Sequence, residues 1–246
     1  MKINHEETKR IEDRRSKIAL RAMTRSSIFH PRSSILDPRS SIFGGVVMAY
    51  PKELMRLSVE EYLALEEKSE VRHEYVAGYI FAMAGATDAH NIIAGNVYAR
   101  ARLHIRRSGC RAYIVDMKVR VEAVDAFYYP DVMVTCEPFV AKSVFKSKPI
   151  LLVEVLSPGT ELTDRREKLS AHFKLESLKE YVLISQDKRQ VEIYRRDKRG
   201  KIQMLVLGAD NEVRFESAPN GALTLTMDDI YEDVIFTQPA PSLEEQ

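Results

Sequence analysis

The stretch that decides the fold runs from Tyr128 to Lys168 and holds YYPDVMV (128–134), PILLVEVLSP (149–158) and TDRREK (163–168). Asp131 follows Pro130 at the head of one apolar run, and Glu154 interrupts a second. A carboxylate inside an apolar strand costs several kcal/mol unless it is paired or bound to a metal. Two such residues in adjacent strands, followed by a basic helix, indicate a metal site for phosphoryl chemistry.

The two carboxylates each have an alternative interpretation. Residues 150–156 are apolar except for Glu154, which is typical of a central strand covered on both faces. Asp131 is expected near a strand end, where α/β proteins place ligands, or it caps a backbone N–H in a turn. Glu154 is either a ligand of Mg²⁺, which prefers hard oxygen atoms, or the partner of a buried cation.

The segment after the second strand is expected to be a helix that carries Asp164 and Lys168 at positions i and i+4 of one face. An exposed ion pair of this kind contributes only about 0.3–0.5 kcal/mol. Because the preceding loop SPGT (157–160) is short, the first turns of the helix should lie close to the end of the Glu154 strand. A lysine there can reach a metal-bound water or a scissile phosphate.

Composition and charge limit the remaining possibilities. No apolar run approaches the ~20 residues of a membrane helix, so no membrane partner is expected. Cys110 and Cys136 form no CxxC pattern and are interpreted as reduced thiols of a cytoplasmic protein. Of the 37 Lys+Arg and 36 Asp+Glu, residues 1–47 hold 10 and 5, so the rest of the chain is mildly acidic. Contacts with nucleic acid must therefore come from local basic clusters.

The chain divides into three parts. Residues 1–47 contain a seven-residue repeat (SSIFHPR, SSILDPR, SSIFGG) with two prolines and are expected to be a disordered N-terminal extension. Met48 is an alternative start, and a basic arm that touches nucleic acid is the other interpretation. Residues 48–235 are expected to form the domain, and residues 236–246 a tail.

Hydrophobic periodicity within the domain predicts a mixed sheet with helices on both sides, an α/β (α+β) fold. Ser58 and Glu61 form a capping box that opens the first helix. Helices are expected at 57–68, 91–107 and from Thr160 or Thr163 to Glu176, with a helical turn at 227–234. Strands are expected on either side of Gly78 and at 111–115, 118–124, 127–135, 150–156, 180–185, 190–196, 201–206, 212–215 and 222–225.

Four stretches carry a family resemblance: RHEYVAGYIFAMAGATDAHN (72–91), YYPDVMVT (128–135), VEVLSPGTELTDRREK (153–168) and LKEYVLISQD (178–187). With them, residues ~53–235 resemble the Uma2 family of restriction-type endonucleases, within the PD-(D/E)XK nuclease superfamily. The resemblance implies a restriction-endonuclease-like αβββαβ core with a divalent-metal site that takes Mg²⁺ or Mn²⁺.

The resemblance also implies roles for individual residues. Asp131 matches the Asp of the PD element, and Glu154 matches the (D/E) position. Leu156 stands where the motif has its Lys, and the family pattern instead places a Lys on the next helix, where Lys168 fits. Glu74 matches an additional acidic residue, so the implied metal ligands are Asp131, Glu154 and Glu74, with Lys168 as the fourth catalytic residue.

Three further residues are implied as supporting groups. His90 matches a family histidine that orients substrate or metal-bound water, although a lone His at a helix start is more often a capping or packing residue. Asp164 and Ser157 are implied to position the other groups.

The function implied is that of an endonuclease, a hydrolase acting on phosphodiester bonds, with double-stranded DNA as its partner. Enzymes that cut both strands often pair two sites by twofold symmetry, so a homodimer is also expected. The alternative is a nuclease-like fold kept as a binding or assembly module without catalysis, which the missing strand lysine favours. A small-molecule hydrolase lacks support, because the chain has neither GxSxG nor HExxH.

Overall fold

The structure is a computed structural model that describes residues 56–197 and 199–236, all within one compact unit of the chain. The expected N-terminal extension (1–47), the alternative start at Met48 and all but the first residue of the expected tail lie outside the described residues. Among the described residues, no helix is long and apolar enough to cross a membrane.

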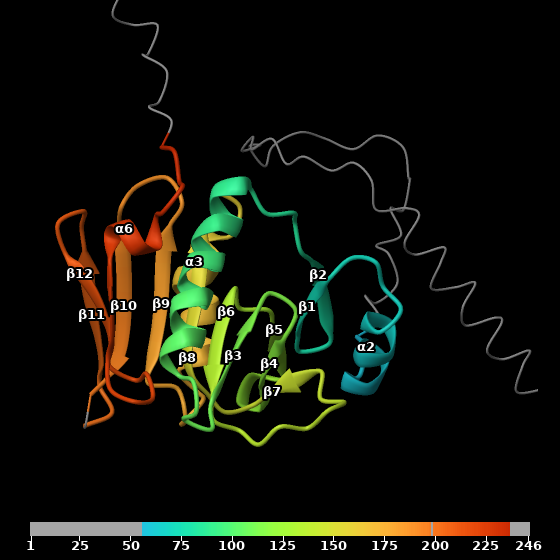
Figure 1. Cartoon of the computed structure of the whole chain (residues 1–246). Helices are drawn as coiled ribbons and strands as arrows, with labels where there is room; N and C mark the ends of the chain where they lie inside the picture. The colour runs from blue at the N-terminus through green and yellow to red at the C-terminus, as the bar shows by residue number, and fades with distance from the viewer. Residues whose placement is uncertain (1–55, 198, 237–246) are drawn as a thin grey trace, which may run out of the picture. The chain divides into compact units, whose positions relative to one another are not determined.

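Runs of strands separate the helices along the described chain (Figure 1). The helices are α2 (Val59–Glu66), α3 (Asp88–His104), α4 (Glu161–Thr163), α5 (Leu169–His172) and α6 (Met227–Ile230), with a 3-10 turn at Glu122–Val124 and a π-helical turn at Asp164–Lys168. The strands are β1 (His73–Val76), β2 (Tyr79–Ala82), β3 (Arg111–Ile114), β4 (Lys118–Val121), β5 (Ala126–Tyr128), β6 (Val132–Thr135), β7 (Phe145–Lys146), β8 (Pro149–Leu156), β9 (Glu180–Ser185), β10 (Val191–Arg196), β11 (Ile202–Leu207), β12 (Glu212–Phe215) and β13 (Leu223–Thr226).

The six-stranded sheet has the order β11-β10-β9-β8-β6-β3, with β8 parallel to β9 and antiparallel to β6. Its strand β8 is buried on both faces, and alternate residues enter different cores. Val153 and Val155 pack in a cluster with residues of α3, α6 and the β12–β13 pair. Leu152 and Leu156 pack in a second cluster with residues of β4, β5 and α5. Odd-numbered residues of β8 from Leu151 to Val155 therefore face the first core, and even-numbered residues face the second.

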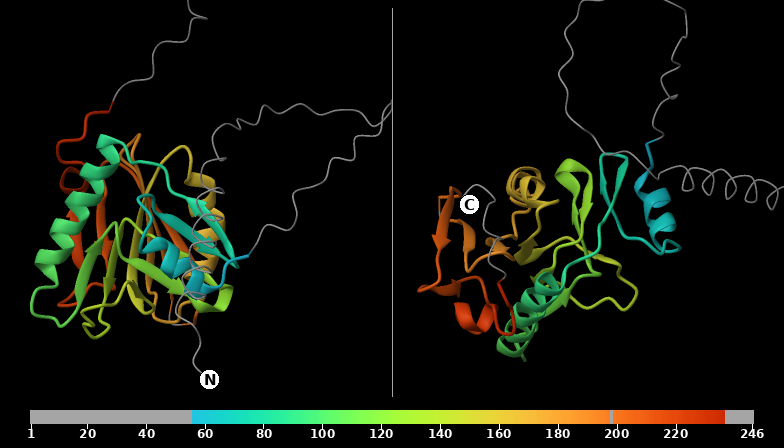
Figure 2. Two further views of the ribbon diagram at one scale, coloured as in Figure 1. Left: turned by 90° about the vertical axis from the view of Figure 1, so that its right-hand side faces the viewer. Right: turned by 90° about the horizontal axis from the view of Figure 1, so that it is seen from above.

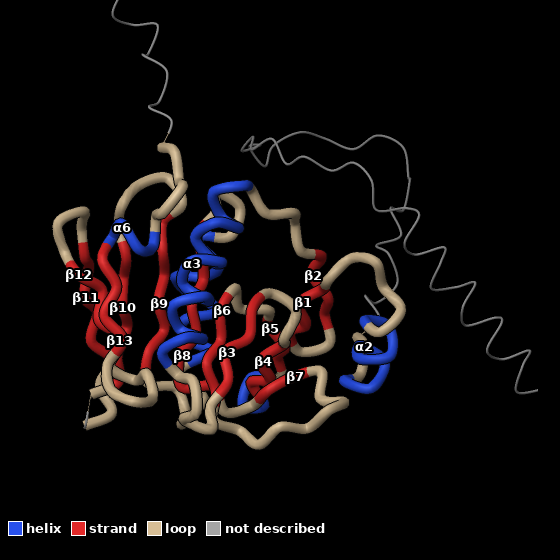
Figure 3. The backbone as a smooth tube through the Cα atoms, viewed as in Figure 1, coloured by secondary structure: helices blue, strands red, loops and turns tan. Residues whose placement is uncertain are grey.

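A second, five-stranded sheet has the order β2-β1-β5-β4-β7 and supplies β4 and β5 to the second core (Figure 3). Seen from above, α3 and α6 lie on one side of the six-stranded sheet and the helix that ends in α5 lies on the other (Figure 2). The predicted mixed sheet flanked by helices is confirmed.

Local sequence signals explain several element boundaries, and other boundaries differ from the expectation, such as the end of the strand expected at 118–124, which stops at Val121. Ser58 and Glu61 form the predicted capping box of α2. The helix expected from residue 91 begins at Asp88, because the Thr87 hydroxyl caps it by accepting from the His90 N–H at 3.2 Å. The single strand expected at 127–135 is two strands, β5 and β6, and the break contains Pro130, which has no N–H to donate to a ladder.

The cysteines differ from the expectation as well. The prediction of reduced thiols was wrong, because Cys110 and Cys136 form a disulfide with their Cα atoms 4.0 Å apart. Strands β3 and β6 are antiparallel with Arg111 opposite Thr135, so the next pair outward places the two cysteines opposite each other. A spacing of 26 residues along the chain hides this proximity until the strand register is known.

We predict that replacing both cysteines with alanine lowers the free energy of unfolding by about 2–4 kcal/mol, because the disulfide restricts the unfolded chain. Urea denaturation with and without reductant measures the change. Reductant should move the wild-type transition to that of the double variant and leave the double variant unchanged. Two titratable thiols in unreduced wild-type protein would contradict the disulfide.

Candidate active site

Glu154 lies in β8 with the parity of Leu152 and Leu156, so its side chain enters the second core rather than the core under α3. Its side chain is 5% exposed. The Oε1 atom lies 3.6 Å from Lys168 Nζ and 3.9 Å from His172 Nε2, and it has no hydrogen-bond partner among the described residues. A buried carboxylate oxygen without a hydrogen bond is costly, so this position needs a functional explanation.

Asp131 lies directly opposite Glu154, one pair beyond the Val132–Val153 pair of the antiparallel β6–β8 ladder. Its Oδ2 atom accepts a hydrogen bond from the Val155 N–H at 2.7 Å, and its Oδ1 atom is 2.9 Å from His90 Nε2. Both predicted carboxylates therefore share one face of one sheet. Asp131 also caps a backbone N–H, so the two interpretations of this residue are compatible.

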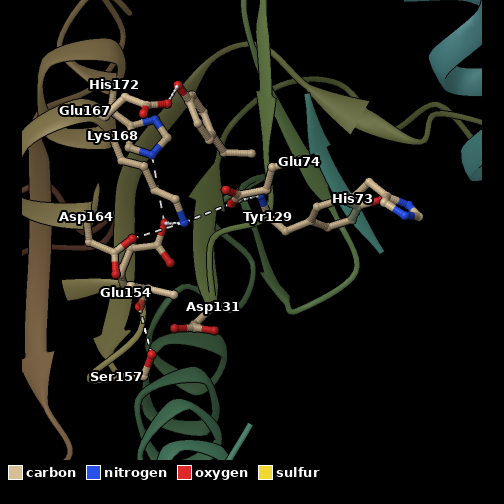
Figure 4. Close-up of polar contacts among 12 residues, drawn as sticks. His73, Glu74, Tyr129, Asp131, Glu154, Ser157, Asp164, Glu167, Lys168 and His172 are labelled. Atoms are coloured by element: carbon tan, nitrogen blue, oxygen red, sulfur yellow. Dashed lines mark hydrogen bonds and ion pairs between the residues drawn. The ribbon is translucent and has the colours of Figure 1, made fainter. Parts of the chain in front are cut away.

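Lys168 ends the π-helical turn, and its ammonium group is the point where three carboxylates converge (Figure 4). Its Nζ atom lies 2.8 Å from Glu74 Oε1, 3.1 Å from Asp164 Oδ1 and 3.6 Å from Glu154 Oε1. The Lys168 and Asp164 side chains are 6% and 2% exposed, so they are not the exposed surface pair that was the alternative interpretation. π-helical turns often mark functional positions within helices.

Glu74 reaches this cluster from the other sheet. It lies in β1, and its Oε1 atom accepts from Lys168 Nζ and, at 3.4 Å, from the Tyr129 N–H. In Figure 4 its carboxylate points toward Lys168. The cluster therefore joins residues from the five-stranded sheet, the six-stranded sheet and the helix between them.

The surroundings raise the pKa of both Glu154 and Lys168, which favours the neutral form of the first and the charged form of the second. Burial, together with the neighbouring Asp164, Asp131 and Glu74 charges, raises the pKa of Glu154 well above its usual value, against the attraction of Lys168. The three carboxylates raise the pKa of Lys168 above its usual value despite burial, which acts to lower it. Lys168 is thus held as an ammonium ion, and Glu154 binds a proton more readily than an exposed glutamate does.

The two remaining sequence-predicted residues differ in position. His90, in the first turn of α3, contacts Asp131, as a residue that orients the site would. Ser157 follows β8, and its hydroxyl oxygen lies 3.0 Å from the Thr160 hydroxyl oxygen. It contacts the start of the next helix rather than the four central side chains.

His172 belongs to the site and was missed by sequence reasoning. It is fully buried between the rings of Tyr128 and Tyr181, each 5.1 Å away between centroids, and neither ring nitrogen has a hydrogen-bond partner among the described residues. Burial and the nearby Lys168 charge lower the pKa of His172 to about 3, so it is neutral at physiological pH. Its signal was its spacing of four residues after Lys168, which continues the Asp164–Lys168 face.

Two carboxylates of the cluster have the chemistry of ligands for a divalent cation. Asp131 and Glu154 offer hard oxygen atoms on one face, and Glu154 Oε1 accepts no hydrogen bond from any described residue. Across residues 56–197 and 199–236, no three His, Cys, Asp or Glu side chains are already arranged to hold a metal. Glu74 is instead engaged by Lys168, so the geometry offers a pair of carboxylate ligands.

Comparisons with known proteins place this chain in a family. A family model named Uma2, described as "Putative restriction endonuclease", matches residues 59–228. The uncharacterized protein slr1290 of Synechocystis sp. is 32% identical over 182 residues, which cover 74% of this chain and 94% of that protein. The uncharacterized protein sll1609 of the same organism is 32% identical over 165 residues, 65% of this chain and 92% of that protein.

A solved structure shares the fold. It is described as a "putative nuclease belonging to DUF820" from Anabaena variabilis, with a TM-score of 0.60 and 20% sequence identity. The match covers 73% of this chain and 99% of that one. The family description and the shared fold together support a nuclease.

We predict that Glu154→Gln stabilises the metal-free protein at pH 8. A carboxyl whose pKa is raised on folding contributes stability below its unfolded value and loses it as pH rises through its folded pKa. At pH 8 the wild type carries this cost and the glutamine does not, while Lys168 keeps Glu74 and Asp164. Thermal unfolding in chelator should show a higher Tm for the variant, and the difference should shrink toward pH 4.5.

The exposed Glu176→Gln is the matched control and should show no such pH-dependent gain. A variant less stable than the wild type at pH 8 would mean that attraction to Lys168 outweighs the cost of burial.

Proposed function

Because the chain belongs to the Uma2 family, we propose that it is a metal-dependent endonuclease that hydrolyses phosphodiester bonds in double-stranded DNA. The observation that carries the proposal is the opposed pair Asp131 and Glu154, two carboxylates on adjacent strands with the Lys168 ammonium beside Glu154. A core residue pair serving stability alone would be better replaced by apolar side chains.

Mg²⁺ or Mn²⁺ is the proposed cofactor, and Asp131 and Glu154 are its proposed ligands. The Glu154 Oε1 atom, which has no hydrogen-bond partner among the described residues, supports this assignment, and Glu74 is the third candidate ligand. When bound, the cation would supply a water of lowered pKa and neutralise charge on the phosphate.

The chain's own residues have separate tasks in this proposal. Lys168 remains protonated and donates hydrogen bonds to a phosphate oxygen as negative charge develops there. Asp164 and Glu74 hold the ammonium group in position. His90 and the Val155 N–H fix the two oxygen atoms of Asp131.

The proposed setting follows from the substrate. Enzymes that cut both strands of a duplex often pair two sites by twofold symmetry, so a homodimer is the proposed working unit. The cytoplasm, where DNA is accessible, is the proposed compartment. Cys136 of the disulfide is exposed, so cytoplasmic thiols would reduce the disulfide there.

A second candidate is a nuclease-like module that binds a partner without catalysis. Leu156 favours it, because it occupies the strand position of the motif lysine and is packed in the core. Titration with Mg²⁺ and Mn²⁺ by calorimetry separates the candidates, since a module of this kind has no need to bind a divalent cation.

We predict that wild-type protein converts supercoiled plasmid to open or linear forms with Mg²⁺ or Mn²⁺ and not with chelator. Glu154→Gln and Asp131→Asn should each lower the rate at least about a hundredfold, because each removes a charged ligand. Lys168→Met should lower kcat, because it removes transition-state stabilisation.

The exposed Glu161→Gln, which alters a carboxylate on the adjacent α4, should cleave like the wild type. Circular dichroism spectra that match the wild type are required of every variant. Undiminished metal-dependent cleavage by a folded Glu154→Gln would remove Glu154 from the mechanism, and absence of metal uptake by the wild type would favour the binding module.

A further inference from the structure

Glu66, near the end of α2, is a buried carboxylate outside the cluster around Lys168. It is 4% exposed, and α2 lies beside the β1–β2 pair (Figure 1). Its Oε1 atom accepts two hydrogen bonds, from the His73 N–H at 3.0 Å and from the Tyr129 hydroxyl at 2.9 Å. Its Oε2 atom lies 3.2 Å from His73 Nδ1.

The two donors belong to the two segments that carry site residues. His73 directly precedes Glu74 in β1, and Tyr129 lies two residues before Asp131 in the segment between β5 and β6. One oxygen atom of Glu66 therefore accepts hydrogen bonds from the residue before Glu74 and from the residue two positions before Asp131.

Further bonds make this connection rigid. The Tyr129 hydroxyl also accepts from Lys118 Nζ at 3.1 Å, and the Tyr129 N–H donates to Glu74 Oε1. The Tyr62 hydroxyl of α2 donates to the His73 carbonyl at 2.7 Å. Each end of Tyr129 is thus bonded to a carboxylate, Glu66 at the ring and Glu74 at the backbone.

We propose that Glu66 is a positioning residue that sets Glu74 and Asp131 relative to each other through His73 and Tyr129. A buried carboxylate is costly, and burial with several hydrogen bonds makes its position specific. Glu66 touches no reacting atom in this proposal, and its effect reaches the site through the segments that it holds. The contacts of Glu66 do not depend on the proposed nuclease activity. The effect of Glu66 on catalysis rests on that proposed activity.

The decisive experiment measures amide hydrogen exchange at two positions. The Val155 N–H donates to Asp131, and the Tyr129 N–H donates to Glu74, so their protection reports the placement of both carboxylates. In Glu66→Ala, both amides should exchange about tenfold faster or more, whereas Val182 and Ile184 in β9 should exchange as in the wild type. Glu66→Gln keeps a carbonyl oxygen that accepts both bonds and should restore wild-type exchange.

Cleavage and metal binding give the functional readouts. Glu66→Ala should lower kcat about 10- to 100-fold with little change in KM and weaken Mn²⁺ binding by a similar factor, and Glu66→Gln should recover most of both. The exposed Glu60→Ala on the same helix is the matched control and should match the wild type.

The outcomes separate the two proposals. Wild-type exchange at Tyr129 and Val155 in Glu66→Ala overturns the positioning role, whatever the protein cleaves. Accelerated exchange with no cleavage by the wild type supports the positioning role and overturns the nuclease. Equal losses in the alanine and glutamine variants also overturn it, because they would show that charge rather than placement matters.

Discussion

The structure depends on one buried ammonium group, that of Lys168, and on the carboxylates that surround it. Glu74, Asp164 and Glu154 come from three separate elements and meet at Nζ. None of these side chains could be buried alone, because removing one partner leaves an uncompensated charge. The five-stranded sheet, strand β8 and the π-helical turn must therefore pack together for any of them to be tolerated. The apolar second core supplies the driving force, and the ion cluster makes its arrangement specific.

The site explains how the motif lysine can move from a strand to a helix. Leu156 lies two residues after Glu154 and so faces the same side of β8, into the second core. A lysine at that position would enter the same space that Lys168 enters from the helix. Because the short connection after β8 returns the chain over this face, a side chain from the π-helical turn reaches Glu154 at 3.6 Å. In the proposed site, Lys168 thus supplies from the helix the ammonium group that the motif supplies from the strand.

Local sequence patterns predicted the strand β8, the capping box of α2 and the proximity of Asp131 to Glu154, because each follows from neighbouring residues or adjacent strands. They did not predict contacts set by long-range pairing. Glu66 meets Tyr129 across 63 residues, and the disulfide depends on the β3–β6 register. His172 resembles an ordinary helical residue until the packing shows that its ring is buried and that neither ring nitrogen has a hydrogen-bond partner among the described residues. The π-helical turn is also invisible to a pattern that assumes a period of 3.6 residues.

The charge balance of the cluster argues against side chains kept only for stability. The cluster holds the carboxylates of Glu74, Asp131, Glu154 and Asp164 and the ammonium group of Lys168, while burial lowers the pKa of His172 to about 3. The site relieves the excess of carboxylates by taking up a proton on Glu154, as its raised pKa indicates, or a divalent cation, as proposed. Apolar side chains of similar volume would stabilise the same core at lower cost. The persistence of an under-neutralised carboxylate cluster is therefore better explained by a ligand that supplies positive charge than by stability.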